Sequence, residues 1–183
     1  VKAVGRVVEK PPQICLLRLQ QILLRPAEAR RLVQAVAAGF APGGRAIPGY
    51  GPDDRVYQGM TIAFDYSIEE SWVPLAAGAT IVPAPPSGAL LGDDLADFMI
   101  DREITALCCV PTLLATIEED LPTLRFLLVS GEACPKALIT RWHRPGRRFL
   151  NVYGPTEATV TATWGVVDPD RPVTLGVPLP TYT

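Results

Sequence analysis

The sequence predicts an α/β protein with a mostly parallel sheet flanked by helices. From residue 55 onward, short apolar runs alternate with amphipathic segments, and this alternation is typical of βαβ units. Two of the apolar runs, residues 104–110 and 125–129, show no polar alternation, which indicates strands covered on both faces. The chain has 183 residues, of which 48% are hydrophobic, and a domain of this size can bury a core.

The predicted elements have local signals. Ser67 and Glu70 have the spacing of a capping box at the start of the first helix, which ends at Gly78. Pro111 suits the first turn of a later helix. The expected strands are residues 56–63, 79–82, 104–110, 125–129 and 148–152, and the expected helices are residues 68–77, 94–102, 112–119 and 135–143.

Charge divides the chain into two parts. Residues 1–48 hold eight Lys and Arg against two Asp and Glu, a net charge of +6, whereas residues 49–183 have a net charge of −8. The spacing at residues 26–40 is compatible with a helix, which the Pro- and Gly-rich residues 41–51 interrupt. We therefore expect a basic segment at 1–48 and a separate α/β part at 49–183.

Composition excludes several classes of protein. The basic residues of the first part form no block and are not interleaved with aromatic residues, so no nucleic-acid partner is expected. No run reaches the roughly 18 apolar residues of a membrane helix, so no membrane partner is expected. The four cysteines form no CxxC pair, which argues against a disulfide scaffold or a zinc site. Together with an N-terminus unlike a signal peptide, these observations favour a reduced, cytoplasmic protein.

Ligand-binding residues are expected at one edge of the sheet. In parallel α/β sheets, ligands bind beyond the carboxyl ends of the strands. Four chemically varied segments lie at or just past these predicted ends: residues 64–67, 108–112, 130–133 and 151–157. We expect them to meet at a shared edge.

The segment at 151–157 contains the residue types of a nucleotide site. Tyr153 offers an aromatic face on which a base can stack, and Gly154 permits close approach of the backbone. Thr156 offers a hydroxyl to a phosphate oxygen, and Glu157 offers a carboxylate of the kind that binds Mg²⁺. The alternative interpretation is a Gly-Pro turn with a solvated glutamate. The chain contains no P-loop motif.

Four motifs in order resemble those of the adenylate-forming enzymes: FDYS at 64–67, SGEA at 130–133, NVYGPTE at 151–157 and LGVPLP at 175–180. Within that superfamily the chain looks like the amino-acid adenylation domains of nonribosomal peptide synthetases. The resemblance implies part of the N-terminal subdomain of such a domain. These enzymes join a carboxylic acid to AMP with ATP and Mg²⁺. They then pass the acyl group to a thiol, which in peptide synthetases is the phosphopantetheine of a carrier protein.

The resemblance implies a role for each residue of the nucleotide site. Tyr153 would stack on adenine beside Gly154. Thr156 would contact the phosphate and Glu157 would hold Mg²⁺, which makes these two the candidate catalytic residues. The rest of the adenine pocket would be Gly131, Glu132, Ala133 and Asn151.

The resemblance also implies an amino-acid pocket. Asp65 would pair with the α-ammonium group of the substrate; the alternative is that Asp65 caps the following helix. Glu69 would face a second cation, such as the side-chain ammonium of ornithine or lysine. The sequence around it looks like synthetases that polymerise cationic amino acids; the alternative is a first-turn glutamate that points into water. The other pocket residues would be Tyr66, Cys108, Leu128, Ser130, Val152, Val160 and Thr161.

Several family motifs are not found in the sequence. Residues 1–50 hold no loop rich in Ser, Thr and Gly with a triphosphate-clamping lysine, and the later ribose-binding aspartate and catalytic lysine are absent. We therefore expect a fragment of an ATP-dependent amino-acid-activating enzyme that shows no ATP–pyrophosphate exchange by itself. The alternatives are a non-catalytic remnant or ligand-binding fragment, and a relative of the acyl-CoA synthetases, which Asp65 disfavours.

Three further features receive structural interpretations. His143 follows a predicted helix and is expected to be a solvated cation. Cys108 and Cys109 are expected to be small apolar fillers of a buried strand. A solvated basic loop is expected at Arg144, Arg147 and Arg148.

Overall fold

The computed structural model describes residues 49–158 and 160–179. The basic segment 1–48, with the expected helix at 26–40, lies outside these residues. The described elements are β1 (Arg55–Gln58), α3 (Ser67–Ala76), β2 (Thr80–Pro83), α4 (Gly92–Asp101), β3 (Ala106–Cys109), α5 (Pro111–Thr116), β4 (Phe126–Val129), α6 (Lys136–Trp142), β5 (Arg148–Tyr153), the 3₁₀ helix η1 (Thr156–Ala158), β6 (Thr163–Val166) and β7 (Val177–Pro178).

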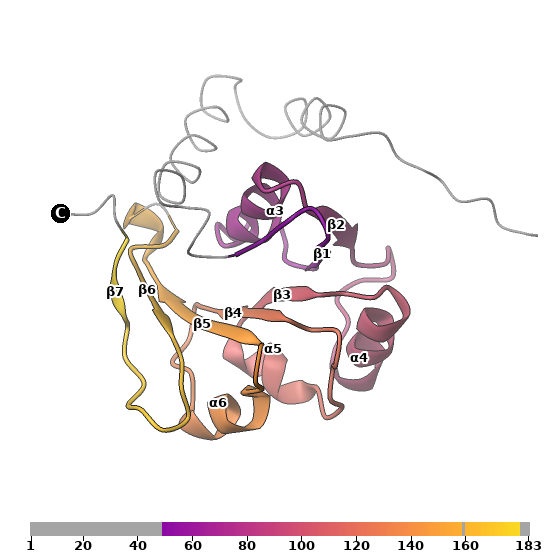
Figure 1. Ribbon diagram of the computed structural model, residues 1–183. Coiled ribbons are helices and arrows are strands. Elements are labelled where there is room, and N and C mark those ends of the chain that lie inside the picture. Colours follow the sequence, from indigo (N-terminus) through magenta and orange to yellow (C-terminus); the bar gives the residue numbers. More distant parts are fainter. Residues whose placement is uncertain (1–48, 159, 180–183) are drawn as a thin grey trace, which may run out of the picture.

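The strands of the described residues form a seven-stranded sheet in the order β2-β1-β3-β4-β5-β6-β7. Strands β2, β1, β3, β4 and β5 pair in parallel, whereas β6 and β7 run antiparallel to their neighbours. Helix α3 lies on one face of the sheet, and α4, α5 and α6 lie on the other (Figure 1). The predicted mostly parallel, helix-flanked sheet is confirmed.

Apolar side chains are buried on both faces of the central strands. In β3, Leu107 and Cys109 belong to the core on the side of α4, α5 and α6. Ala106 and Cys108 belong to a second core, which includes Tyr66 beside α3. Because successive side chains of a strand point to opposite faces, two covered faces require an uninterrupted apolar run. The prediction of buried, apolar cysteines in this strand is confirmed.

The strand predicted at residues 56–63 is too long, because β1 ends at Gln58. The chain beyond it folds into turns, in which the Phe64 amide donates to the Thr61 carbonyl at 3.0 Å. The FDYS segment therefore lies in a turn before α3 and does not follow directly on a strand.

The predicted capping box at the start of α3 is wrong. The N-cap residue is Tyr66, and no side-chain hydrogen bond caps the helix there. Glu70 is fully buried, and its carboxylate accepts hydrogen bonds from the amides of Gly59 and Met60. The carboxylate is therefore engaged with the loop after β1 and not with the N-terminus of its own helix.

The β6–β7 hairpin is not among the predicted elements. It pairs with β5 in the register Asn151↔Gly165 and Val152↔Trp164, and its second strand, Val177–Pro178, is part of the LGVPLP motif. Gly176, with a φ of +79°, lies so close to β6 that an added Cβ would be 1.9 Å from the Trp164 carbonyl oxygen. The hairpin therefore forms one edge of the sheet, next to β5 and the loop that follows it.

Asp54 joins the amino ends of three strands. Its buried carboxylate accepts hydrogen bonds from Gly51 N and Thr105 Oγ1, each at 2.7 Å, and from Arg125 Nε at 2.6 Å. Burial by itself would raise the pKa of Asp54, but the bonds from Arg125, Thr105 and Gly51 lower it below its usual value. An ionised aspartate thus holds the edge of the sheet opposite the carboxyl ends.

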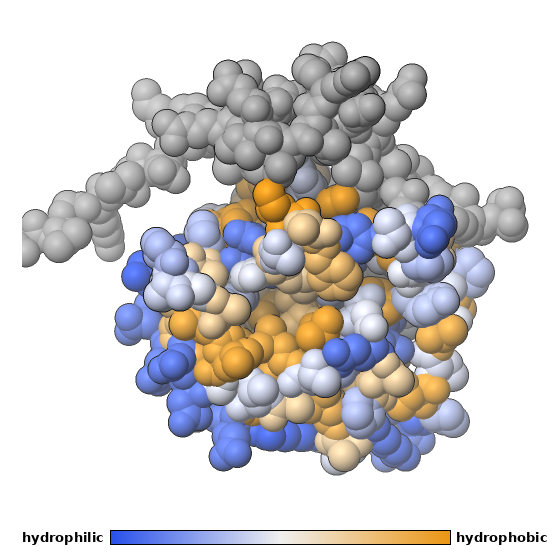
Figure 2. Space-filling model, turned by 180° about the vertical axis from the view of Figure 1, so that it is seen from behind, coloured by the Kyte–Doolittle hydropathy of each residue, from blue (hydrophilic) through white to orange (hydrophobic). Residues whose placement is uncertain are grey.

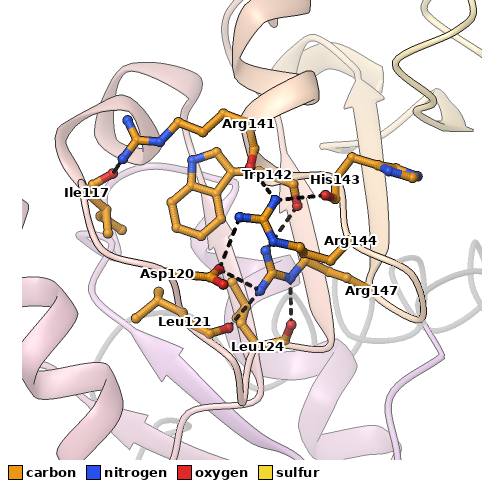
Figure 3. Close-up of polar contacts among 9 residues, drawn as sticks. All are labelled: Ile117, Asp120, Leu121, Leu124, Arg141, Trp142, His143, Arg144 and Arg147. Carbon is orange, nitrogen blue, oxygen red and sulfur yellow. Dashed lines mark hydrogen bonds and ion pairs between the residues drawn. The ribbon is translucent and has the colours of Figure 1, made fainter.

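Arg147 is buried, which corrects the prediction of a solvated basic loop. Its guanidinium donates to the carbonyls of Leu124 and Leu121 at 2.7 Å and to that of Trp142 at 3.0 Å (Figure 3). The same group lies 5.5 Å from the centre of the Trp142 ring. Arg147 therefore connects α6 with the segment before β4. His143, by contrast, is exposed after α6, as predicted.

Apolar side chains gather in patches on the face shown in Figure 2. The large apolar side chains exposed among the described residues are Ile62, Phe64, Leu91, Ile100, Tyr153, Val166, Val173, Leu175 and Val177. Four of these lie between residues 166 and 177, in the β6–β7 hairpin. In the part of the chain that the structure describes, no helix is long and apolar enough to cross a membrane.

Candidate functional site

Three loops meet at the carboxyl ends of β1, β3 and β4. Gly131 follows β4 with a φ of +84°, a conformation that favours glycine. A Cβ placed there would lie 3.3 Å from Cγ1 of Val110, after β3, and 3.7 Å from Cζ of Phe64, before α3. Segments that are distant in the sequence therefore lie together, as the parallel order predicts.

The side chain of Glu132 holds the start of α5. Its Oε2 accepts a hydrogen bond from Thr112 N at 3.0 Å, and its Oε1 accepts one from Thr112 Oγ1 at 2.8 Å. The carboxylate thus fixes the loop that also contains the exposed Gly131 and Ala133. Its contribution to an adenine pocket would be to position this loop.

The loop after β5 exposes an aromatic ring beside a tight turn. Tyr153, at the end of β5, is 48% exposed. At Gly154, an added Cβ would lie 2.3 Å from the Val160 carbonyl oxygen and 2.7 Å from the Ala162 nitrogen. Only glycine fits between these two backbone segments. The exposed Thr156 and Glu157 follow in η1.

Asn151 faces the β6–β7 hairpin. Its Nδ2 donates to the Thr174 carbonyl at 3.0 Å, and the residue is buried. The amide therefore supports the loop after β5 by tying the strand to the hairpin.

Gly154→Ala is expected to lower the free energy of unfolding by about 1–3 kcal/mol, because the added methyl group must displace backbone. Urea unfolding followed by circular dichroism would measure this loss. Gly51→Ala is the matched control, since nothing lies within 4 Å of its added Cβ. Equal behaviour of the two variants would contradict the tight-turn argument.

A second group of predicted residues forms a buried cluster on the α3 side of the sheet. Tyr66 Oη donates to the Leu128 carbonyl at 3.2 Å, and Thr161 Oγ1 donates to Glu69 Oε1. The apolar members pack in the same core as Tyr66; they are Cys108, Leu128, Val152 and Val160. Ser130, also buried, follows β4, and its amide donates to the Cys109 carbonyl at 3.3 Å.

Glu69 is the acidic side chain beside this cluster. It is 2% exposed, so the interpretation as a solvated first-turn glutamate is wrong. Its Oε2 has no hydrogen-bond partner among the described residues. Burial raises the pKa of Glu69 to about 7, the bond from Thr161 lowers it, and the nearby Asp65 raises it. An unpaired buried carboxylate of this kind is costly unless a donor or a cation reaches it.

Asp65 lies in the turn before α3 and is partly exposed. Its main-chain carbonyl accepts a hydrogen bond from Ile68 N at 2.9 Å. The helix has no side-chain cap at its N-cap residue Tyr66, which gives no support to the capping interpretation.

Sequence reasoning missed Tyr50 and Glu70. Tyr50 Oη lies 3.1 Å from Cys108 Sγ, and its ring lies 4.5 Å from that of Phe126. No local pattern marks Tyr50, because its contacts are more than 50 residues away. The sequence pattern predicts a capping box for Glu70, and only the packing of α3 on the sheet shows that its carboxylate binds the amides of Gly59 and Met60.

The described residues contain no group of three or more His, Cys, Asp or Glu side chains that could hold a metal ion. A magnesium ion bound with a nucleotide needs only one or two protein carboxylates besides the phosphates. The exposed carboxylate of Glu157, four residues after Tyr153 in the chain, fits that requirement.

These features define a class of protein: a mostly parallel α/β fold in which an exposed aromatic–glycine loop lies beside a buried glutamate of α3. The chain belongs to the family of AMP-binding enzymes, which matches residues 27–183. The predicted family is therefore confirmed, and the boundary near residue 48 stays a prediction.

The chain is similar to nonribosomal peptide synthetases and their adenylation domains. Delta-poly-L-ornithine synthetase of Acinetobacter baumannii is 44% identical over 137 residues, which are 75% of this chain and 10% of that protein. The AMPPNP-bound form of the nonribosomal peptide synthetase FmoA3 is 30% identical with a TM-score of 0.63, covering 81% of this chain and 17% of that one. Holo-PA1221, which contains adenylation and PCP domains, is 25% identical with a TM-score of 0.58, covering 65% of this chain and 22% of that one. The chain thus spans a small part of each relative.

Proposed function

We propose that this chain is the part of an ATP-dependent amino-acid-activating enzyme that binds the amino acid and the adenosine moiety. The enzyme would form an aminoacyl-AMP and pass the aminoacyl group to the phosphopantetheine of a carrier protein. The observation that supports this most is the hydrogen bond from Thr161 Oγ1 to Glu69 Oε1. It joins the segment that follows the exposed Tyr153 loop to the buried acid of α3.

The loop after β5 would bind the nucleotide. The exposed ring of Tyr153 offers a stacking surface for adenine. Gly154 and Gly131 keep side chains out of the approach, while Glu132 and Asn151 position the loops on either side. Thr156 would contact a phosphate oxygen and Glu157 would hold Mg²⁺, which neutralises phosphate charge when it is bound.

The pocket beside α3 would bind the amino acid. Asp65, partly exposed at its mouth, would pair with the α-ammonium group. The side chain would enter the buried set that includes Tyr66 and Cys108. A carboxylate at this position favours an amino acid over the fatty acid of an acyl-CoA synthetase, because a fatty acid offers no ammonium group.

The substrate would carry a cationic side chain, such as that of ornithine or lysine. Glu69 is buried, and its Oε2 has no partner among the described residues. An ammonium group would supply both the missing hydrogen bond and the compensating charge. The similarity to a protein named as a poly-L-ornithine synthetase supports the same substrate class.

A ligand-binding fragment without catalysis remains the second candidate, favoured by the lack of a triphosphate-clamping loop in residues 1–50. Both candidates require that the chain bind an aminoacyl adenylate, so a binding measurement distinguishes them from functions that need no such ligand. We expect the 183-residue chain to bind a non-reactive sulfamoyl analogue of ornithyl-AMP at least about tenfold more tightly than the corresponding leucyl analogue, as measured by calorimetry.

Two variants assign the binding to its parts. Tyr153→Ala should weaken both analogues and AMP by roughly tenfold or more, since base–aromatic stacking is lost. Glu69→Gln should remove the preference for ornithyl over leucyl, while the exposed Glu119→Gln should change neither. Equal affinity for the two analogues in the unmodified chain would refute a cationic substrate. Absence of binding to either analogue would refute the proposed function.

A further inference from the structure

Glu70 is a buried acid that the proposed chemistry does not use. It is fully buried and lies in the first half of α3, next to Glu69. Its Oε1 accepts a hydrogen bond from Gly59 N at 3.0 Å, and its Oε2 accepts one from Met60 N at 3.1 Å and one from Gln58 Nε2 at 3.3 Å. Both oxygens are thus bound to the chain just beyond the carboxyl end of β1.

The partners of Glu70 are neutral. No ion pair to it is found among the described residues. Burial raises the pKa of Glu70 to about 7, although the bonds from Gly59, Met60 and Gln58 lower it. Burying a carboxylate without a cation costs free energy unless hydrogen bonds compensate for the lost water. The amides of Gly59 and Met60 supply such bonds, and we call this arrangement of two adjacent amides on the Glu70 carboxylate the clamp.

The clamp acts on the segment that carries Asp65. Residues 59–66 connect β1 to α3 and are otherwise shaped by short turns, with Phe64 N on Thr61 O and Ser67 N on Phe64 O, each at 3.0 Å. Gln58 Nε2 also donates to the Met60 carbonyl at 2.9 Å. One end of the segment is therefore anchored by Glu70 and the other by the helix that bears Glu70.

We propose that Glu70 is a positioning residue for the amino-acid site: by holding the Gly59 and Met60 amides, it fixes residues 59–66 so that Asp65 meets the substrate ammonium group. This inference rests on the proposed function, in which Asp65 contacts the substrate. Glu70 itself contacts neither the amino acid nor the nucleotide. Its effect passes through the backbone of the segment.

Glu70→Gln tests the clamp, because glutamine keeps the volume but can accept from only one of the two amides at its carbonyl oxygen. The probes are the ornithyl sulfamoyl analogue, its counterpart without the α-amino group, and AMP, each titrated into the full chain by calorimetry. We expect the variant to bind the ornithyl analogue roughly tenfold more weakly, and to bind the desamino analogue and AMP within about twofold of the unmodified chain.

Three outcomes overturn the proposal: unchanged affinity for the ornithyl analogue, an equal loss for all three probes, or an equal loss for the ornithyl and desamino analogues. If Glu70→Gln fails to fold, Gln58→Met removes one donor to Glu70 and leaves the amides in place. It should lower affinity for the ornithyl analogue alone, by about threefold, and the lack of that selective loss would also overturn the clamp. Failure of the unmodified chain to bind the ornithyl analogue would refute the proposed function instead.

Discussion

Arg147→Met is expected to lower the free energy of unfolding by about 2–5 kcal/mol, because buried carbonyls lose a charged hydrogen-bond donor. The guanidinium donates to the carbonyls of Leu121, Leu124 and Trp142, and methionine supplies no donor. The Leu121 carbonyl keeps the bond from the Leu124 amide, whereas the Leu124 and Trp142 carbonyls lose the Arg147 donor, at about 1–3 kcal/mol for each buried carbonyl left without a partner. The ion pair to Asp120 adds little, because that carboxylate is 55% exposed and 3.7 Å away.

Urea unfolding followed by circular dichroism would measure the loss. Arg144→Met is the matched control, because its side chain is 43% exposed and its hydrogen bonds reach the carbonyls of His143 and Arg141 (Figure 3). That variant should cost less than about 1 kcal/mol. A similar loss in both variants would show that Arg147 is no more important to the fold than its exposed neighbour.

The affinity for the ornithyl analogue is expected to rise roughly 30-fold between about pH 5.5 and about pH 8. Burial raises the pKa of Glu69 to about 7 in the unliganded chain, so the carboxyl group is mostly protonated at the lower pH. The substrate ammonium pairs only with the ionised form. Binding at low pH must therefore first remove the proton, and the affinity levels off above the pKa of the free chain.

The leucyl analogue is the control for this pH dependence. It shares the α-ammonium group that faces Asp65, and any titration of Glu70 affects it equally. Tyr50, Tyr66 and Cys108 border Glu69, and burial raises their pKa values, so they stay neutral over this range. The leucyl profile, like the ornithyl profile of Glu69→Leu, should show only the shared contribution of Glu70 and Asp65, so the roughly 30-fold rise appears as the difference between the ornithyl and leucyl profiles of the unmodified chain. Parallel profiles for both analogues would rule out Glu69 as the group responsible.

Most of the parallel fold could be predicted from the sequence, because its signals are local. An uninterrupted apolar run such as that around Cys108 and Cys109 is required wherever both faces of a strand are covered. Gly78 ends α3 and Pro111 begins α5, since the backbone preferences of these residues act within one turn. The β6–β7 hairpin escaped prediction, because its short strands depend on pairing with β5 and have little pattern of their own.

The candidate site could be predicted as residue types and order, but the partners of those residues could not. Glu132 and Asn151 look like ligand contacts in the sequence, yet their side chains hold Thr112 and the Thr174 carbonyl. Arg147 looks like one of several solvated arginines, and only the approach of Leu121 and Leu124 buries it.

By itself, the sequence determined the alternation of strands and helices, the family, and the segments that gather at the carboxyl edge. The tertiary structure alone decided what the two adjacent glutamates of α3 do. Consecutive residues on a helix point about 100° apart, so Glu69 turns toward Thr161 and the pocket while Glu70 turns toward Gly59 and Met60. Both have the local signature of first-turn acids at a helix start, and only the packing of α3 against the sheet distinguishes them. The physical reason is that burial and hydrogen-bond partners, which set the charge and role of a carboxylate, come from residues far away in the chain.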